Sequence, residues 1–369
     1  MNLFFFIVFG LYFLLMILLL VGWQKKPSSH ERKLALATIT VVVPFRNEAN
    51  TIIQLIDDLA KLDYPGEYFE VILVNDHSTD SSAEIVTRRI SYLSNFRMLS
   101  LAVGKQGKKQ AMTAAIASAA GEIIATTDAD CRIPVQWLYF INDCFGNGHP
   151  KMVLGGVRIA DDHDFFSQMQ ALEFSSLVGV SGATSRLGFT TMCNGANLAF
   201  LKSAFHEVKG YEGNFNIASG DDEFLMRKIQ QRFPQRILFM AAPESVVTTA
   251  SQKTVGDFVD QRLRWAGKWK YNSSWISRLL AVFVLTFQIS FISLLMPTWF
   301  KQIDLQWALF LIGLKLILEF VFLFRVGVFL RTKWRMLHFL ILQFVYPLYI
   351  IFIGVTSLFF SHTWKGRKN

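Results

Sequence analysis

The chain has 369 residues, a formal charge of +9 and 52% hydrophobic residues, which is too apolar for an ordinary soluble protein. The apolar residues concentrate at the two ends, while residues 35–250 have a normal polar mixture and are numerous enough to bury their own core. Many basic residues flank apolar segments, so the positive charge favours a membrane surface. The middle of the chain lacks the basic stripe with interleaved aromatics that nucleic-acid binding requires, which argues against a nucleic-acid partner.

Three cysteines occur at wide spacings: Cys131, Cys144 and Cys193. An odd number without a C-x-x-C pair predicts neither a disulfide framework nor a structural zinc site. Reduced thiols fit a cytoplasmic domain.

Four apolar runs are candidates for membrane-spanning helices: residues 2–22, 279–297, 305–324 and 336–360. The first has no basic residues before it and no small-residue cleavage site after it, so we expect a retained anchor rather than a signal peptide. The basic residues that follow it are Lys25, Lys26, Arg32 and Lys33. Because basic residues favour the cytoplasmic side, the N-terminus is expected outside and the central domain inside.

The side of the C-terminal tail stays open. The basic loop 325–335 is expected in the cytoplasm and the nearly neutral loop 298–304 outside. Three crossings after the central domain would place the tail outside, but its basic segment 365–368 favours the inside. Tyr346-Pro347 interrupts the last run, so this run is either a crossing or a re-entrant segment.

Two charged residues lie inside the run 305–324. Lys315 and Glu319 are four residues apart and can pair on one helix face. They either neutralise each other against neighbouring helices or line a polar path for a product.

The central domain alternates strands with helices. Strands are predicted at 38–43, 70–75, 97–101 and 122–127, the first two of them buried, and helices at 50–61, 81–93 and 108–120. This order predicts an α/β fold with a mostly parallel sheet and helices on both faces. Ligands bind beyond the carboxyl ends of the strands in such sheets, so the residues after each strand are the candidates for a site.

Acidic groups follow three of these strands and a basic group follows the other. Asp128 and Asp130 come after the last strand and are one residue apart, so they can share a hard divalent ion, although a solvated turn has the same pattern. Asp76 ends the second strand, where a carboxylate can accept hydrogen bonds from a base or ribose, whereas Asp80 fits a turn or helix cap better. Lys108 begins a helix after two glycines and predicts an anion site. The combination suits a metal-bound diphosphate attached to a nucleoside.

Two further motifs lie closer to the C-terminus. Asp221 and Asp222 open a helix after Gly220. The helix dipole favours acids at this position, so they could serve only to stabilise the helix. Activation of an acceptor hydroxyl, however, needs a carboxylate base. We expect Asp222 to be that base. The segment 261–265 (QRLRW) lies on a helix just before the membrane runs, and it fits both an interfacial helix and a site with an arginine for diphosphate and a tryptophan for a sugar ring.

Seven motifs together resemble the inverting family-2 glycosyltransferases with a GT-A fold. The closest branch is the membrane-bound one, with cellulose, chitin and hyaluronan synthases and ceramide glucosyltransferase-like enzymes. The motifs run in order over about residues 38–270: VVVPFRNEANTI, VNDHSTD, GKKQAM, DAD, CNGANLAF, GDDEFL and QRLRW.

This resemblance implies roles for individual residues. The donor nucleotide sugar would be bound by Pro44, Arg46, Glu48, Asp76, Lys108 and Asp128, and the metal, Mg²⁺ or Mn²⁺, by Asp130 with Asp128. The acceptor would be bordered by Asn194, Gly195, Asn197, Asp221 and Trp265, and the diphosphate bound by Gln261 and Arg264. Asp222 would act as general base in a direct displacement that inverts the anomeric carbon.

The resulting plan has four parts: a membrane anchor (1–24), a cytoplasmic GT-A domain (35–250), an interfacial helix (251–278) and about three further membrane helices (279–369). We expect a multi-pass protein of the bacterial inner membrane that transfers a sugar from a nucleotide-diphosphate sugar to a lipid or glycan acceptor. Two alternatives stay open, a processive polysaccharide synthase and an inactive scaffold or translocation subunit. The small membrane part favours one or a few additions, and the intact acidic motifs argue against the scaffold. The sequence does not determine the oligomeric state.

Overall fold

The computed structural model describes residues 2–24, 35–215, 217, 220–267, 275–296, 304–359, 363–364 and 367–368. The chain divides into two compact units. The membrane unit consists of residues Met1–Gln24, Asp161–Ala183 and Ser251–Asn369, and the α/β unit of Lys25–Ala160 and Thr184–Ala250. Residues 161–183 thus join the membrane helices, although the sequence assigns them to the central domain.

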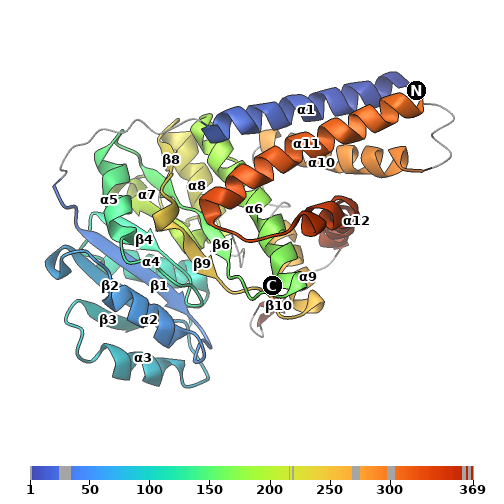
Figure 1. Cartoon of the computed structure of the whole chain (residues 1–369). Helices are drawn as coiled ribbons and strands as arrows, with labels where there is room; N and C mark the ends of the chain where they lie inside the picture. Colours follow the sequence, from blue (N-terminus) through green and yellow to red (C-terminus); the bar gives the residue numbers. More distant parts are fainter. Residues whose placement is uncertain are drawn as a thin grey trace. The chain divides into compact units, whose positions relative to one another are not determined.

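The main sheet of the α/β unit has seven strands among the described residues, in the order β3-β2-β1-β4-β7-β5-β8 (Figure 1). The strands are β1 (Ile39–Phe45), β2 (Phe69–Asn75), β3 (Phe96–Ser100), β4 (Ile123–Thr126), β5 (Met152–Leu154), β7 (Leu198–Leu201) and β8 (Ile237–Phe239). Only β7 runs antiparallel to its neighbours, β4 and β5. The mostly parallel α/β fold predicted from the sequence is confirmed, because the β-branched runs of β1 and β2 are buried on both faces.

Helices connect these strands. They are α2 (Ile52–Ala60), α3 (Ser82–Ile90), α4 (Lys108–Ser118), α5 (Trp137–Gly146), α7 (Lys202–Glu207) and α8 (Asp221–Arg232), with the short 3-10 turns η1 (Gly66–Tyr68), η2 (Gly195–Asn197) and η3 (Pro243–Ser245). A separate parallel pair joins β6 (Val157–Ile159) to β9 (Val247–Thr249). Ile52, Leu55, Ile56 and Leu59 of α2 recur at helical spacing and are fully buried, so burial of one face rather than capping fixes this helix.

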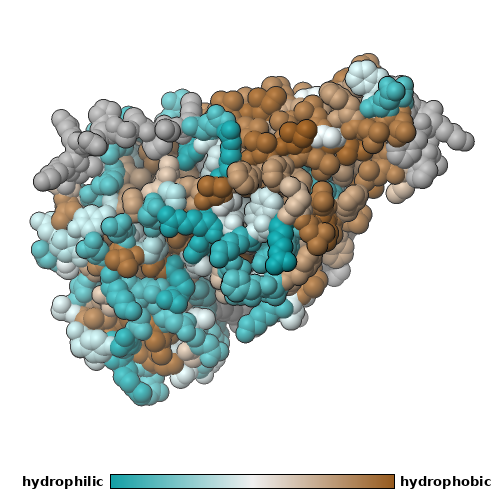
Figure 2. Space-filling view, in the orientation of Figure 1, coloured by the Kyte–Doolittle hydropathy of each residue, from teal (hydrophilic) through white to brown (hydrophobic). Residues whose placement is uncertain are grey.

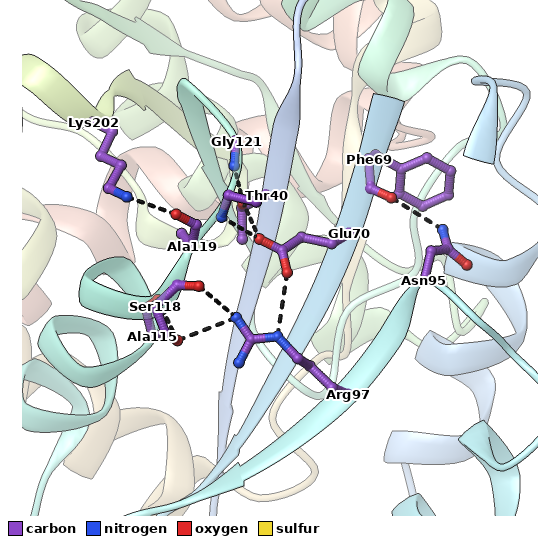
Figure 3. Close-up of polar contacts among 11 residues, drawn as sticks. Thr40, Phe69, Glu70, Asn95, Arg97, Ala115, Ser118, Ala119, Gly121 and Lys202 are labelled. Carbon is purple, nitrogen blue, oxygen red and sulfur yellow. Dashed lines mark hydrogen bonds and ion pairs between the residues drawn. The ribbon is translucent and has the colours of Figure 1, made fainter. Parts of the chain in front are cut away.

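Polar side chains at the amino ends of β1 and β2 satisfy one another (Figure 3). The Glu70 carboxylate accepts hydrogen bonds from the Thr40 hydroxyl at 2.8 Å, the Ala120 amide at 2.5 Å and the Arg97 side chain at 3.2 Å. Arg97 in turn donates to the carbonyl oxygen of Ser118 at 2.8 Å. These polar contacts at the amino ends of the strands therefore hold the strands together, and the candidate site lies at the carboxyl ends.

The membrane unit contains α1 (Asn2–Gln24), α9 (Val255–Gly267), α10 (Trp275–Leu294), α11 (Leu305–Leu330), α12 (Met336–Phe359) and most of α6 (Phe165–Arg186). A short pair, β10 (Thr363–Trp364) and β11 (Arg367–Lys368), follows α12. Four of these helices, α1, α10, α11 and α12, are long and apolar enough to cross a membrane. The view in Figure 2 shows a hydrophobic surface over α1, α10 and α11, as expected for helices in lipid.

Within this unit α1, α10 and α11 run across the view of Figure 1, whereas α12 is seen nearly end-on. α12 continues as a helix through Pro347, so the expected interruption at Tyr346-Pro347 is wrong. The absent proline amide costs one internal hydrogen bond, and α12 packs against α9 and α10.

The charged residues of α11 pair as the sequence predicts. Lys315 Nζ lies 2.9 Å from Glu319 Oε1, and Lys315 also donates to Gln343 of α12. The Tyr12 hydroxyl of α1 donates to Glu319 at 2.5 Å. This polar cluster joins three of the apolar helices, and its partners reduce the cost of placing charges among them.

Candidate active site

Two loops that follow β1 and β2 are tied together by Arg46. Its guanidinium donates to the carbonyl oxygens of Asp76 at 2.8 Å and His77 at 2.7 Å. His77 has a positive φ of 54°, and this left-handed turn brings its ring nitrogen within 2.9 Å of the Lys105 carbonyl oxygen. Pro44 is inside β1, one residue before the strand ends. The structure thus brings Pro44, Arg46 and Asp76 to the carboxyl ends of neighbouring strands.

Glu48 and Asp80 both bind the start of α3, but in different ways. The Glu48 amide donates to the Ser82 hydroxyl at 2.7 Å, and the Glu48 carboxylate accepts from Thr51 at 3.0 Å. The Asp80 carboxylate accepts from the Ser82 amide at 3.0 Å and the Ala49 amide at 3.2 Å. Burial would raise the pKa of Asp80, but these hydrogen bonds hold it below its usual value. Asp80 therefore has the turn-forming role that the sequence favours for it.

Asp76 connects β2 to the start of α4. Its side chain is buried, and Oδ2 accepts a hydrogen bond from the Gly107 amide at 3.0 Å. Gly107 has a φ of 93°, which glycine adopts without strain, and this conformation turns the chain into α4. The next residue, Lys108, is thereby placed at the carboxyl edge of the sheet.

Lys108 joins two acidic loops. Its ammonium lies 2.6 Å from Asp128 Oδ1, after β4, and 3.4 Å from Asp221 Oδ2, at the start of α8. Burial alone would lower the pKa of Lys108, but Asp128 and Asp221 outweigh it and raise that pKa well above its usual value. The lysine is therefore a permanent cation at the point where the two loops meet.

Asp130 is exposed, in contrast to its neighbours in the chain. Cys131, directly after it, is buried, and burial together with Asp130 and Asp128 raises the pKa of its thiol well above the usual value. Among the described residues, no group of three or more His, Cys, Asp or Glu side chains is close enough to hold a metal by itself. Asp128 and Asp130 supply two hard oxygen donors, which suits Mg²⁺ or Mn²⁺ when water and phosphate oxygens complete the shell.

Asp222 faces the turn before β7. Its Oδ2 accepts from the Gly195 amide at 3.0 Å and its Oδ1 from the Glu223 amide at 2.8 Å. A Cβ atom added to Gly195 would lie 3.3 Å from Lys108 Nζ and 3.5 Å from Asp222 Cβ, so this glycine permits the close approach of both side chains. The structure therefore brings Gly195, Lys108, Asp221 and Asp222 into one cluster.

The turn at residues 194–197 reaches this edge because β7 is antiparallel: its first residue, Leu198, pairs with Thr126, the last residue of β4. The Thr126 hydroxyl donates to the Gly195 carbonyl oxygen at 2.7 Å, and the Asn194 side chain caps η2 by accepting from the Ala196 amide at 2.9 Å. Asn194 and Gly195 thus border the cluster.

Asn197 differs, because its side chain is only 1% exposed. Its amide nitrogen donates to the carbonyl oxygens of Gly156 and Ser245, and its oxygen accepts from Trp137 at 2.9 Å. Asn197 therefore holds the turn in place rather than facing the cluster.

The structure gives three residues of this region roles that the sequence does not indicate. Tyr211 is buried, and burial, then Asp221, raise the pKa of its hydroxyl well above the usual value. Lys109 donates to the carbonyl oxygens of Asn214 and Ile217, so it fixes the segment before α8 rather than offering a charge to a ligand. Thr126 belongs to a buried strand. Their roles depend on contacts between segments far apart in the chain, which no local pattern reports.

Gln261, Arg264 and Trp265 lie on α9, in the membrane unit. They are three and four residues apart, which places them on one side of the helix. All three are partly exposed.

Comparison with known proteins identifies a domain within the chain. The model described as glycosyl transferase family 2 matches residues 40–209, which include β1–β4 and the Asp128–Asp130 motif. These residues form a family 2 glycosyltransferase domain. The chain is 26% identical over 325 residues to a poly-beta-1,6-N-acetyl-D-glucosamine synthase of Staphylococcus epidermidis, covering 85% of this chain and 74% of that one. A synthase of the same name from Staphylococcus aureus is 27% identical over 252 residues, 66% of this chain and 57% of that one.

A solved structure supports the fold of the glycosyltransferase. The mannosyltransferase PcManGT from Pyrobaculum calidifontis, in complex with GDP-Man and Mn²⁺, superposes with a TM-score of 0.60 at 19% identity, covering 96% of both chains. The α/β unit therefore has the GT-A fold. With its four apolar helices, this glycosyltransferase is a membrane protein.

Proposed function

We propose that the protein transfers a sugar from a nucleotide-diphosphate sugar to a hydroxyl of a lipid or glycan acceptor, with inversion of the anomeric carbon. The site is proposed to face the cytoplasm at a bacterial cell membrane. The observation that carries the proposal is Lys108, which joins Asp128 to Asp221 at the carboxyl edge of a family 2 domain. A cation between two acidic loops at this edge fits a diphosphate leaving group.

The donor half of the proposed site follows β1, β2 and β4. The loop from Pro44 to Glu48 and the carboxylate of Asp76 would hold the base and ribose. Lys108 would turn from Asp128 toward the diphosphate when a donor binds. Asp128 and Asp130 would hold a divalent ion, which neutralises charge on the departing diphosphate.

The acceptor half follows from the position of Asp222. Its carboxylate would remove the proton of the acceptor hydroxyl as the oxygen attacks the anomeric carbon. The bond from that carbon to the diphosphate breaks in the same displacement, so the nucleoside diphosphate leaves with the bonding electrons and the anomeric carbon inverts. Asn194, Gly195 and Asp221 would border the acceptor, and Gln261, Arg264 and Trp265 of α9 would bind diphosphate and acceptor.

The relatives give the donor to test first. The staphylococcal proteins are named as synthases of poly-N-acetylglucosamine. We therefore infer an N-acetylhexosamine donor as the first candidate for this chain, with other hexoses as alternatives. A processive synthase is the second candidate function, favoured by the same names.

The test is donor turnover by the purified protein in lipid. UDP- and GDP-sugars are supplied with Mg²⁺ or Mn²⁺, and release of nucleoside diphosphate is measured beside size-resolved products. Asp130→Ala should abolish metal-dependent release, while Asp63→Ala, which removes an exposed carboxylate of the same unit outside the site, should retain it. A ladder of long chains would establish the processive alternative. No turnover and no donor binding over the whole panel, with membrane lipids present, would overturn the proposed function.

A further inference from the structure

Helix α9 buries an arginine inside the segment that carries Gln261, Arg264 and Trp265. Arg262 is only 3% exposed, although the neighbouring Asp260 is exposed. Burying a guanidinium costs several kcal/mol unless charge and hydrogen bonds compensate. Such a residue needs partners, and its partners indicate what it does.

All three nitrogen atoms of the Arg262 guanidinium have hydrogen-bond partners. Nε and Nη2 face the carboxylate of Glu173 on α6, at 3.3 and 2.5 Å. Nη1 donates to the side-chain oxygen of Gln261 at 2.5 Å. The Glu173 pair is bidentate, so it fixes the plane of the guanidinium as well as its position. Arg262 therefore holds the side chain of Gln261.

The flat faces of the guanidinium contact aromatic rings. Its central carbon lies 4.3 Å from the ring centroid of Trp265 and 4.5 Å from that of Phe258. Trp265 also packs against Phe174, the residue after Glu173, with ring centroids 5.9 Å apart. Two successive residues of α6 thus help to fix Trp265: Phe174 contacts its ring directly, and Glu173 holds the Arg262 side chain that lies against it.

Glu173 is itself fixed within the membrane unit. It is buried, and the hydroxyl of Tyr349 on α12 lies 3.4 Å from its Oε1. Phe258 packs against the ring of Tyr349, with centroids 5.6 Å apart. The ion pair therefore connects α6, α9 and α12.

We propose that Arg262, anchored by Glu173, is a positioning residue that sets the orientation of Gln261 for the diphosphate and of Trp265 for the acceptor. The inference rests on the proposed function for the role of those two side chains. It assigns to Arg262 a task that lysine cannot perform, because an ammonium has neither the planar fork for Glu173 and Gln261 nor the flat face for Trp265.

The first test is Arg262→Lys, with Asp260→Asn on the exposed side of α9 as the matched control. We expect transfer to the acceptor to fall roughly 100-fold in kcat/KM, because a small misplacement of a binding side chain has that effect. The Kd of the nucleoside diphosphate should also rise, because Arg262 holds Gln261, which is assigned to the diphosphate. Hydrolysis of the donor by water should fall less than transfer, since Trp265 is assigned to the acceptor. Equal loss of transfer and hydrolysis would contradict the proposal.

A second variant separates positioning from stability. Glu173→Leu, Arg262→Met and Tyr349→Phe together remove both charges and the hydroxyl, and replacing a buried ion pair by apolar groups is often neutral or stabilising. This triple variant should unfold at or above the wild-type temperature and still lose transfer. If it transfers like the wild type, Arg262 and Glu173 have only a structural role.

A third measurement does not depend on turnover. The emission of Trp265 is obtained by subtracting the spectrum of each protein's Trp265→Phe counterpart. In Arg262→Lys this emission should become more accessible to acrylamide, and in Asp260→Asn it should not change. An unchanged Trp265 signal in Arg262→Lys would overturn the proposal even if no donor is turned over, whereas absent turnover with a changed signal would count against the proposed function alone.

Discussion

At the scale of single residues, Lys108 shows how position rather than type gives a side chain its role. Lys108 and Lys109 are adjacent at the start of α4, yet the first contacts Asp128 and Asp221 and the second contacts carbonyl oxygens of the segment before α8. The helix turns by about 100° between them, so the two side chains face different surroundings.

We expect Lys108→Met to lower kcat/KM by roughly 100-fold, about 2.7 kcal/mol, because a charged donor to the leaving group is lost. Lys105→Met, in the exposed loop before α4, is the control and should retain activity. Nucleoside diphosphate affinity, measured by calorimetry, should weaken in Lys108→Met alone. Equal affinities in the two variants would exclude Lys108 from diphosphate binding.

The pH dependence follows from the raised pKa of Lys108. The pKa of Lys108 is higher in the folded protein than in the unfolded chain, where it is about 10.4. Lys108 therefore carries its full positive charge below the unfolded pKa, and it loses that charge only as the pH rises through the higher folded pKa. Lys108 should therefore stay protonated up to about pH 10, and the affinity that it adds should be constant from about pH 8 to about pH 10, above the range in which the nucleoside diphosphate itself titrates. Affinities of the wild type and Lys108→Met that converge within this range would contradict the prediction.

Asp221 and Asp222 can be distinguished by substitution. Asp221 contacts Lys108, whereas Asp222 accepts amide hydrogen bonds from Gly195 and Glu223. We expect Asp222→Asn to reduce transfer by roughly 100- to 10,000-fold, the range for loss of a general base, without weakening donor binding. Asp221→Asn should affect both donor binding and transfer, but less severely. A larger loss of kcat in Asp221→Asn would assign the base to Asp221.

The placement of Asp76 and Asp128 at the carboxyl ends of buried strands could be predicted from the sequence. Asp76 and Asp128 needed only the strand pattern and the rule that parallel strands end at one edge. Asn197 was expected to border the acceptor, but its side chain is buried among other segments. Arg262 could not be recognised as buried, because its partner Glu173 lies 89 residues earlier in the chain.

At the scale of elements, the first four strands were predictable and the later ones were not. β1 and β2 are seven-residue apolar runs that alternate with amphipathic helices, whereas β5 and β8 have three residues each and β7 has four. Strands this short carry too little periodicity to be recognised. α6 was also missed, since its 22 residues mix serines and glycines with apolar residues.

Gly155 lies between β5 and β6, directly against the side chain of Asn197. A Cβ atom on Gly155 would lie 2.2 Å from the Asn197 amide, which is held by three hydrogen bonds and cannot move aside. We expect Gly155→Ala to destabilise the α/β unit by about 1–3 kcal/mol through overpacking, seen as a lower unfolding temperature. Gly66→Ala, where the added atom meets nothing within 4 Å, is the control. Equal unfolding temperatures would show that Asn197 can yield.

At the scale of the membrane unit, polar contacts decide how the apolar helices associate. Apolar side chains gain little from leaving lipid for one another, so hydrogen bonds and ion pairs specify the partners. Tyr12, Glu319, Lys315 and Gln343 connect α1, α11 and α12 in this way. The sequence predicts the pair within α11, but the partners on α1 and α12 required the folded structure.

The direction of α12 bears on which side of the membrane holds the C-terminal tail, a question that the sequence leaves open. α1, α10 and α11 run along one another, and α12 is inclined steeply to them (Figure 1). Seven of its exposed apolar residues recur every three or four positions along the helix, with Met336 and Val345 exposed beside them: Leu337, Leu340, Phe344, Leu348, Phe352, Val355 and Phe359. Such a stripe allows a helix to lie in the plane of the membrane, with its other face on α9 and α10.

If α1, α10 and α11 cross and α12 lies in the plane, the tail stays on the side of the catalytic unit, where its basic residues are favoured. We expect Lys368→Cys, in a chain with the three native cysteines replaced, to react with an impermeant maleimide only after the cells are opened. Lys105→Cys, in the catalytic unit, should behave in the same way. Met296→Cys, at the end of α10, should react in intact cells. Reaction of Lys368→Cys in intact cells would instead make α12 a fourth crossing, with the tail's positive charge on the outer side against the usual preference.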